Sequence, residues 1–143
     1  MNQLPALPRT PSAAEKAPSR TARLVLALPD TPRRGEIRQY FADQGWEVHI
    51  ARSSCEVRTL AHKLSPAATV LAADGSGGES GWLTCSKLVL ERPRLRVVLV
   101  GEKPSPRTER LAAFVGAASY LPQSASLQAL ERAVVGSTAL SRN

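Results

Sequence analysis

Residues 67–73 read AATVLAA and residues 97–100 read VVLV, and these short apolar runs decide the fold class. Similar runs occur at three more places, each followed by an amphipathic stretch: RLVLAL at 23–28, VHIA at 48–51 and ASYL at 118–121. Near-continuous apolar runs are typical of strands buried on both faces of a parallel sheet covered by helices. Five such units, joined by right-handed connections, predict an α/β domain with one doubly wound, five-stranded parallel sheet.

The first connection between a strand and a helix distinguishes two versions of this fold. It reads LPDTP at residues 28–32 and lacks the GxGxxG pattern that holds a pyrophosphate in dinucleotide-binding domains. We therefore predict a flavodoxin-like sheet with strand order 2-1-3-4-5. The domain is expected to span residues 23–136.

The two ends of the chain differ from this pattern. Residues 1–22 are rich in Pro, Ala and Ser, which predicts a disordered or polyproline-II tail, and residues 137–143 are expected to be frayed. No apolar run approaches the ~20 residues of a membrane span. Prolines also interrupt the segment where a secretion signal would need an apolar stretch. We therefore expect a cytoplasmic protein.

Composition limits the function classes. The formal net charge of +7 allows weak attraction to nucleic acid, anionic lipid or an acidic protein. Nucleic-acid binding is not expected, because basic residues alternate with glutamates and no helix-turn-helix or RNP pattern occurs. Cys55 and Cys85 have no metal or redox spacing, so no metal is predicted. Trp82 is the one good candidate for stacking on a cofactor. We expect no bound cofactor. No catalytic residues are predicted.

Helical periodicity predicts which side chains of the amphipathic stretches face the core. In the third of these stretches the core side is expected to include Leu83 and Leu88, with Val89 or Leu90 as a further member. In the fourth it is expected to include Leu111, Ala112, Phe114 and Val115, before a stop at Gly116.

Two segments resemble the receiver domains of response regulators. Residues 44–51, QGWEVHIA, resemble the G-Y-x-V that follows the first receiver helix, and residues 114–121, FVGAASYL, resemble the A-G-A-x-x-Y-L that enters strand five. The resemblance covers about residues 22–136. It implies a flavodoxin-like fold and a role in two-component signalling.

The resemblance also implies a set of phosphoryl-transfer positions. In the family, an aspartate after strand three accepts the phosphoryl group, two acidic residues after strand one hold Mg²⁺, and a hydroxyl and a lysine bind the transferred group. Counting from Gly81 places the acceptor on Ala73, whereas the strand end favours Asp74, which we take as the equivalent. The supporting positions fall on Leu28 and Pro29, with Asp30 next to them, and on Gly101 and Gln123.

These substitutions predict a degenerate pocket, and hence a stand-alone pseudo-receiver that binds a protein partner independently of phosphorylation in bacterial regulation. The resemblance implies that partners, or a second copy in a homodimer, dock on the face made by Thr108–Val135, with Arg107, Arg110 and Tyr120 on or beside it. Tyr120 matches the switch aromatic of receivers. Gly101 cannot offer it a hydroxyl partner, which predicts a fixed ring.

Two alternatives remain open at this point. The first is an active receiver that a histidine kinase phosphorylates on Asp74. The second is a basic adaptor that binds nucleic acid in a salt-dependent way.

Overall fold

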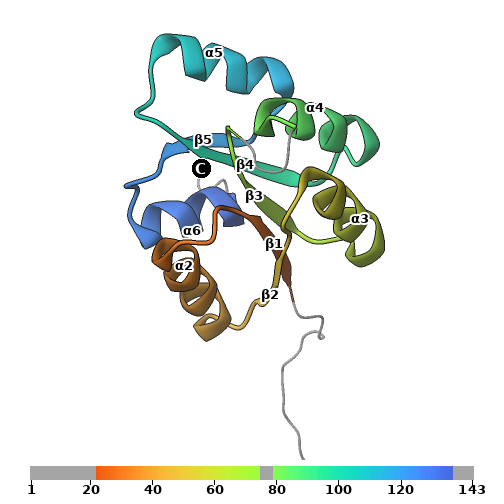
Figure 1. Ribbon diagram of the computed structural model, residues 1–143, viewed down its shortest axis with the longest axis vertical. Coiled ribbons are helices and arrows are strands. Elements are labelled where there is room, and N and C mark those ends of the chain that lie inside the picture. Colours follow the sequence, from red (N-terminus) through yellow and green to blue (C-terminus); the bar gives the residue numbers. More distant parts are fainter. Residues whose placement is uncertain (1–21, 75–78, 137–143) are drawn as a thin grey trace, which may run out of the picture.

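Five parallel strands form the centre of the computed structural model, which describes residues 22–74 and 79–136 (Figure 1). The strands are β1 (Arg23–Ala27), β2 (Glu47–Ile50), β3 (Ala68–Ala72), β4 (Arg96–Gly101) and β5 (Ser119–Pro122). The helices are α2 (Pro32–Asp43), α3 (Ser54–Leu64), α4 (Gly81–Glu91), α5 (Pro106–Val115) and α6 (Leu127–Val135). The predicted tail, except Ala22, and the predicted frayed end lie outside the described residues.

The order of the strands is β2-β1-β3-β4-β5, and every neighbouring pair is parallel, which confirms the predicted fold class. In this register Leu26 of β1 lies between Ile50 of β2 and Val70 of β3. From β1 the chain passes to β2 on one side of β1, and β3, β4 and β5 then follow on the other side of β1. Such a reversal opens a crevice beyond the carboxyl ends of the strands, where ligands bind in sheets of this kind.

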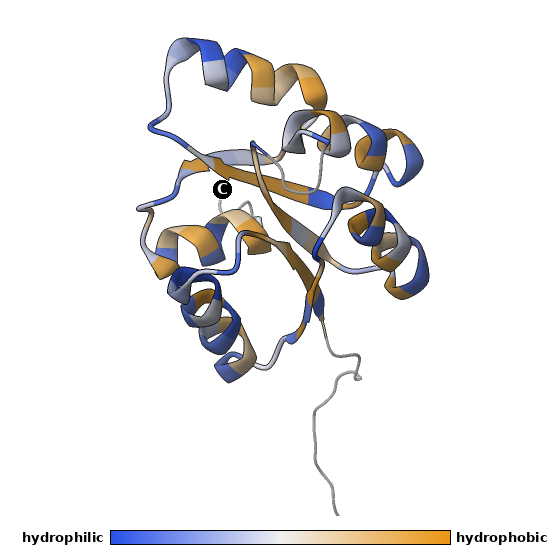
Figure 2. Ribbon diagram, in the orientation of Figure 1, coloured by the Kyte–Doolittle hydropathy of each residue, from blue (hydrophilic) through white to orange (hydrophobic). Residues whose placement is uncertain are grey.

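Alternate residues of the strands supply two separate cores. Leu24 and Leu26 of β1 face α2 and α6 on one side of the sheet. Val25, between them, faces the other side, where α3 and α4 pack and the end of α5 adds partly buried residues. Figure 2 shows the hydrophobic colouring concentrated along the strands, while the helices carry both kinds of residue. This alternation explains why the strands read as unbroken apolar runs.

Serine caps begin four of the five helices. The hydroxyl oxygens of Ser53, Ser80, Ser105 and Ser126 each accept a hydrogen bond from the backbone N–H three residues later. Helix α2 begins differently, with Thr31 at its cap position but no side-chain capping bond, followed by Pro32. The first turn of α2 therefore depends on packing and on proline geometry.

The predicted core sides of α4 and α5 are wrong in part. Phe114 is 86% exposed, and Leu83 and Leu90 are 49% and 79% exposed. In α5 the buried side centres on Ala112, and Phe114 lies two positions further along, on the opposite side of the helix. In α4, Leu83 and Leu90 lie seven residues apart on the side opposite the sheet. Hydrophobic periodicity alone did not show which stripe faces the core.

Thr69, in the middle of β3, should respond to substitution by becoming more stable. Its side chain is fully buried, and its Oγ1 has no hydrogen-bond partner within residues 22–74 and 79–136. Thr69→Val removes this unpaired hydroxyl at nearly constant shape, so urea unfolding should show a gain of about 1 kcal/mol. Thr84→Val is the matched control, because that buried hydroxyl donates to Glu79 and Ser80, and it should destabilise the fold. Loss of stability in both variants would contradict the assignment.

The two cysteines should differ in reactivity. Cys55 is exposed on α3, whereas Cys85 is fully buried in α4. Burial raises the pKa of the Cys85 thiol to about 11, and the thiolate is the reactive form. An aromatic disulfide reagent at pH 8 should therefore modify one thiol quickly and the second only in denaturant. Rapid modification of both thiols in the folded protein would show that α4 opens readily.

Candidate functional site

The residues that follow β1 supply no free carboxylate. Leu28 is buried in the core beneath α2. The side chain of Asp30 is 89% exposed, and its Oδ1 lies 2.9 Å from a guanidinium nitrogen of Arg34. Arg34 also donates a hydrogen bond to the Leu28 carbonyl. The one acidic residue at this position is therefore paired within the chain.

At the end of β3, the two positions considered for the phosphoacceptor differ in exposure. Ala73 is buried, its N–H donates to the Val100 carbonyl, and its own carbonyl accepts from the Gly81 N–H at 2.9 Å. Asp74 is exposed and follows it directly. Of the two, only Asp74 presents a carboxylate, at the carboxyl edge where the fold places ligands.

The described part of the chain does not match a magnesium site of the kind the resemblance implies. It holds no group of three or more His, Cys, Asp or Glu residues arranged to hold an ion. Mg²⁺ needs several oxygens in a near-ideal octahedron. Leu28 and Pro29 offer no side-chain oxygen, and Asp30 is paired with Arg34.

Tyr120 fills the space beside Gly101. A Cβ built on Gly101 would lie 2.5 Å from the Tyr120 hydroxyl and 3.1 Å from the Ala73 Cβ. The Tyr120 hydroxyl donates a 3.0 Å hydrogen bond to the Glu102 carbonyl. Any larger residue at position 101 would collide with the tyrosine. The glycine therefore permits the inward position of the ring.

Trp82 of α4 holds the other side of this ring. The two ring centroids are 5.5 Å apart and the planes are inclined by only 6°. Burial, and then the negative charges of Glu102 and Asp74, raise the pKa of Tyr120, so its phenol stays neutral at physiological pH. The sequence singled out Tyr120 as the switch aromatic and Trp82 as a candidate for stacking on a cofactor. In the structure, Trp82 stacks on Tyr120.

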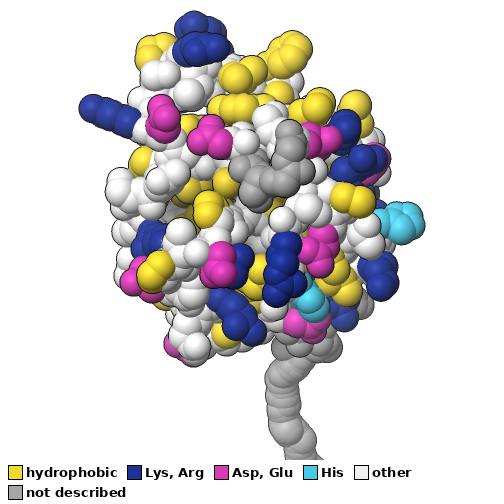
Figure 3. Space-filling model, viewed as in Figure 1, with side chains coloured by type: hydrophobic (Ala, Val, Ile, Leu, Met, Phe, Trp, Pro, Cys, Tyr) yellow, Lys and Arg dark blue, Asp and Glu magenta, His cyan; other side chains and the backbone are white. Residues whose placement is uncertain are grey.

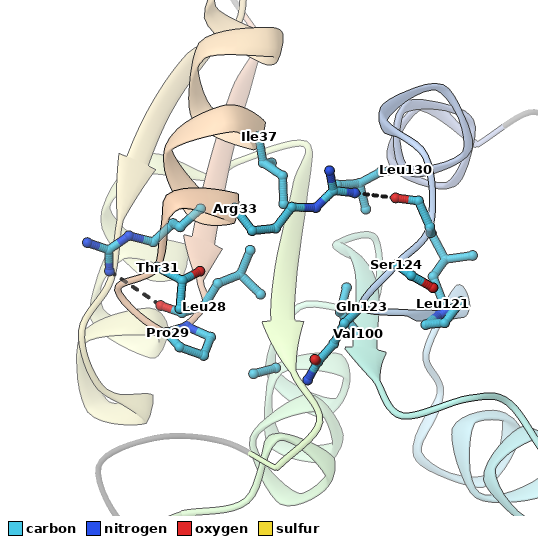
Figure 4. A pocket seen from close by; sticks show the side chains of 14 residues that line it. Leu28, Pro29, Thr31, Arg33, Ile37, Val100, Leu121, Gln123, Ser124 and Leu130 are labelled. Atoms are coloured by element: carbon cyan, nitrogen blue, oxygen red, sulfur yellow. Dashed lines mark hydrogen bonds between the residues drawn. The ribbon is translucent and has the colours of Figure 1, made fainter.

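Gln123, which the resemblance placed at the family lysine, directly follows β5 and binds the end of β4. Its N–H donates to the Gly101 carbonyl at 2.8 Å. It lines a cavity of about 490 Å³ together with Leu28 and Pro29 (Figure 4). Three of the predicted pocket positions thus lie around one hollow, while Gly101 contacts Tyr120 and Asp30 faces solvent.

The predicted interaction face carries both basic and apolar side chains. Arg107 and Arg110 are exposed on α5, as are Phe114 on the same helix and Val135 at the end of α6. Figure 3 shows hydrophobic and basic side chains gathered near α5 at the top of the view. Tyr120 is turned inward, toward Trp82 of α4.

Comparison with known proteins gives a likeness in structure only. No family model matches the sequence, and no curated protein matches it significantly. A CheY-like receiver domain from Methanospirillum hungatei superimposes with a TM-score of 0.73 at 17% identity, over 81% of this chain and 92% of that one. The chain has the fold of a receiver domain.

Two further structures with the receiver fold differ in what they contain. A Burkholderia pseudomallei response regulator with a phosphorylated aspartic acid and a calcium ion has a TM-score of 0.70 at 21% identity, over 80% of this chain and 66% of that one. The yeast receiver domain of Ssk1, solved with the phosphotransfer protein Ypd1, has a TM-score of 0.72 at 11% identity, over 80% of this chain and 87% of that one.

No helix within the described ranges is both long and apolar enough to cross a bilayer.

Proposed function

We propose that this chain is a pseudo-receiver, a cytoplasmic module of bacterial signalling that binds a protein partner without being phosphorylated. The observation that supports the proposal is the chemistry of the hollow at the carboxyl edge of the sheet. Leu28, Pro29 and Gln123 line a hollow that is mostly apolar, and Tyr120 occupies the space beside Gly101. A phosphoryl group needs cationic and hydrogen-bonding partners to offset its charge, and these positions offer few of them.

The surface proposed for the partner is formed by α5, β5 and α6. Phe114 is 86% exposed on α5, near the exposed Arg107 and Arg110. A large aromatic side chain beside arginines is the composition found at the centres of protein interfaces. A fixed Tyr120 would keep this face in one arrangement, because its ring is held by Trp82 and by the Glu102 carbonyl.

Affinity capture from the native cell tests both parts of the proposal. The tagged full chain, Asp74→Ala and Phe114→Ala are compared after each variant has been shown to unfold with wild-type cooperativity. We expect Asp74→Ala to retain the partner and Phe114→Ala to lose it, since truncation of a residue that carries much of an interface's binding energy weakens binding by about 2 kcal/mol or more, roughly thirtyfold. Loss of the partner in Asp74→Ala alone would contradict the proposal.

An active receiver is the second candidate, and one observation favours it. Asp74 is exposed directly after the buried end of β3, and its charge reaches Tyr120, whose pKa it helps to raise. In that case capture of the partner would depend on Asp74 and on a phosphoryl donor.

A further inference from the structure

The largely apolar cavity at the carboxyl edge of the sheet is large enough for a small molecule. It lies between α2 and α6, over the ends of β3, β4 and β5, and measures about 490 Å³. Sites for small ligands commonly measure 300–1,000 Å³ and are lined by apolar groups with a few polar ones. The apolar lining here includes Leu28, Ile37, Ala72, Val100, Leu121 and Leu130.

The charged groups in the lining are all basic. Arg33 and Arg34 line the cavity, and no Asp or Glu does so among the described residues. Arg34 is committed to Asp30. Arg33 reaches across the cavity, where its guanidinium donates to the Ala125 carbonyl, and it makes a long 3.4 Å contact with the exposed Glu36 (Figure 4).

Arg33 has donors to spare for a ligand. A guanidinium carries five N–H donors in a rigid fork that matches a carboxylate, and these two contacts use two of them. Gln123 and Ser124 add polar groups on the opposite wall of the cavity. The cavity thus combines a largely apolar lining with the guanidinium of Arg33, whose donors are only partly used.

We propose that this cavity binds a small amphipathic carboxylate. Its aliphatic body would lie between α2 and α6, and its carboxylate would pair with the guanidinium of Arg33. A compact, strongly hydrated dianion such as phosphate fits this lining poorly, because apolar walls cannot replace its water. The proposal does not depend on phosphorylation independence, since it concerns a different ligand at the same edge of the sheet.

Such a ligand would join two parts of the molecule. Arg33 belongs to α2, and Ala125 belongs to the connection between β5 and α6. A carboxylate bound between Arg33 and Ser124 would link α2 to the segment that leads into α6. Helix α6 is part of the face proposed for the protein partner, so occupancy of the cavity would be communicated to that face.

Titration of the full chain with straight-chain acids tests the proposal. Hexanoate and octanoate, below micellar concentrations, are followed by calorimetry and by amide NMR, with octanol as the uncharged control. We expect saturable one-site binding with shifts at Leu28, Ile37, Val100 and Leu130. The two extra methylenes of octanoate should tighten Kd about fifteenfold over hexanoate, and octanol should bind about tenfold more weakly than octanoate.

Substitution of Arg33 tests the contribution of the carboxylate to binding separately from that of the aliphatic chain. Arg33→Ala should weaken octanoate binding about tenfold and leave octanol unaffected. Arg38→Ala should change neither, because Arg38 is exposed on the same helix and does not line the cavity. If Arg33→Ala does not fold, Arg33→Gln replaces it. The comparison of octanoate with octanol on the wild-type chain then still isolates the effect of the carboxylate. Absence of saturable octanoate binding in the millimolar range, or equal binding of octanol and octanoate, would overturn the proposal.

Discussion

Replacement of Gly81 by alanine is expected to lower the free energy of unfolding by about 3 kcal/mol. Gly81 is the first residue of α4 and is buried against the end of β3. A Cβ at this position would lie 2.0 Å from the Ala72 carbonyl oxygen and 2.9 Å from the Ala73 Cα. Both are backbone atoms, so no rotamer change can relieve the collision, and α4 would have to move away from the sheet.

Gly35→Ala provides the matched control. Gly35 lies near the start of α2, is exposed, and has no atom within 4 Å of its ideal Cβ position apart from its own helix backbone. Alanine should stabilise this helix by about 1 kcal/mol, because glycine is the weaker helix former. Chemical denaturation of the two variants beside the wild type gives the comparison. Similar stabilities for the two would show that α4 does not pack closely on β3.

Gly101→Thr should release Tyr120 from its inward position. The introduced Cβ would lie 2.5 Å from the Tyr120 hydroxyl, so the ring must turn outward. The turn would break the hydrogen bond to the Glu102 carbonyl and the stack on Trp82. Together these contacts are worth about 2 kcal/mol, which should appear as lost stability.

The ring position can be measured directly. Aromatic NMR should show the loss of contacts between Tyr120 and Trp82 in Gly101→Thr. Tyr120→Phe is the control, because it keeps the stack on Trp82 and removes only the hydroxyl, so its stability should fall by about 1 kcal/mol. Retention of the stack in Gly101→Thr would contradict this prediction. It would mean that the backbone at the end of β4 moves to accommodate the threonine while the ring stays in place.

Much of the fold could be predicted because its main determinant is local. Strands buried on both faces need unbroken apolar runs, and AATVLAA and VVLV supply them for the two central strands. Helix starts are local as well, since the side chains of Ser53 and Ser126 cap the first turns of α3 and α6. The inward side of α5 was not readable, because Phe114 and Leu111 are both apolar and only packing decides between them.

The sequence indicated part of the lining of the hollow at the carboxyl edge of the sheet. Offsets from the two family-like segments named Leu28, Pro29 and Gln123, and all three line one cavity. The basic side of that cavity was not foreseen. Arg33 is one of the basic residues that alternate with glutamates along the chain, and its contact with Ala125 joins residues 92 positions apart in sequence. The stack of Tyr120 on Trp82 also joins residues far apart in sequence, so no local pattern indicates it.

Addition of beryllofluoride and millimolar Mg²⁺ to the isotopically labelled chain, followed by amide NMR, is the most direct test of the central claim. The claim is that a receiver fold persists here without phosphoryl chemistry. We predict that the amide signals of Asp30, Asp74, Gly101 and Gln123 stay unchanged, since the described residues hold no group of three or more His, Cys, Asp or Glu side chains arranged to bind the ion. Saturable shifts centred on those four residues would contradict the claim and establish an active receiver.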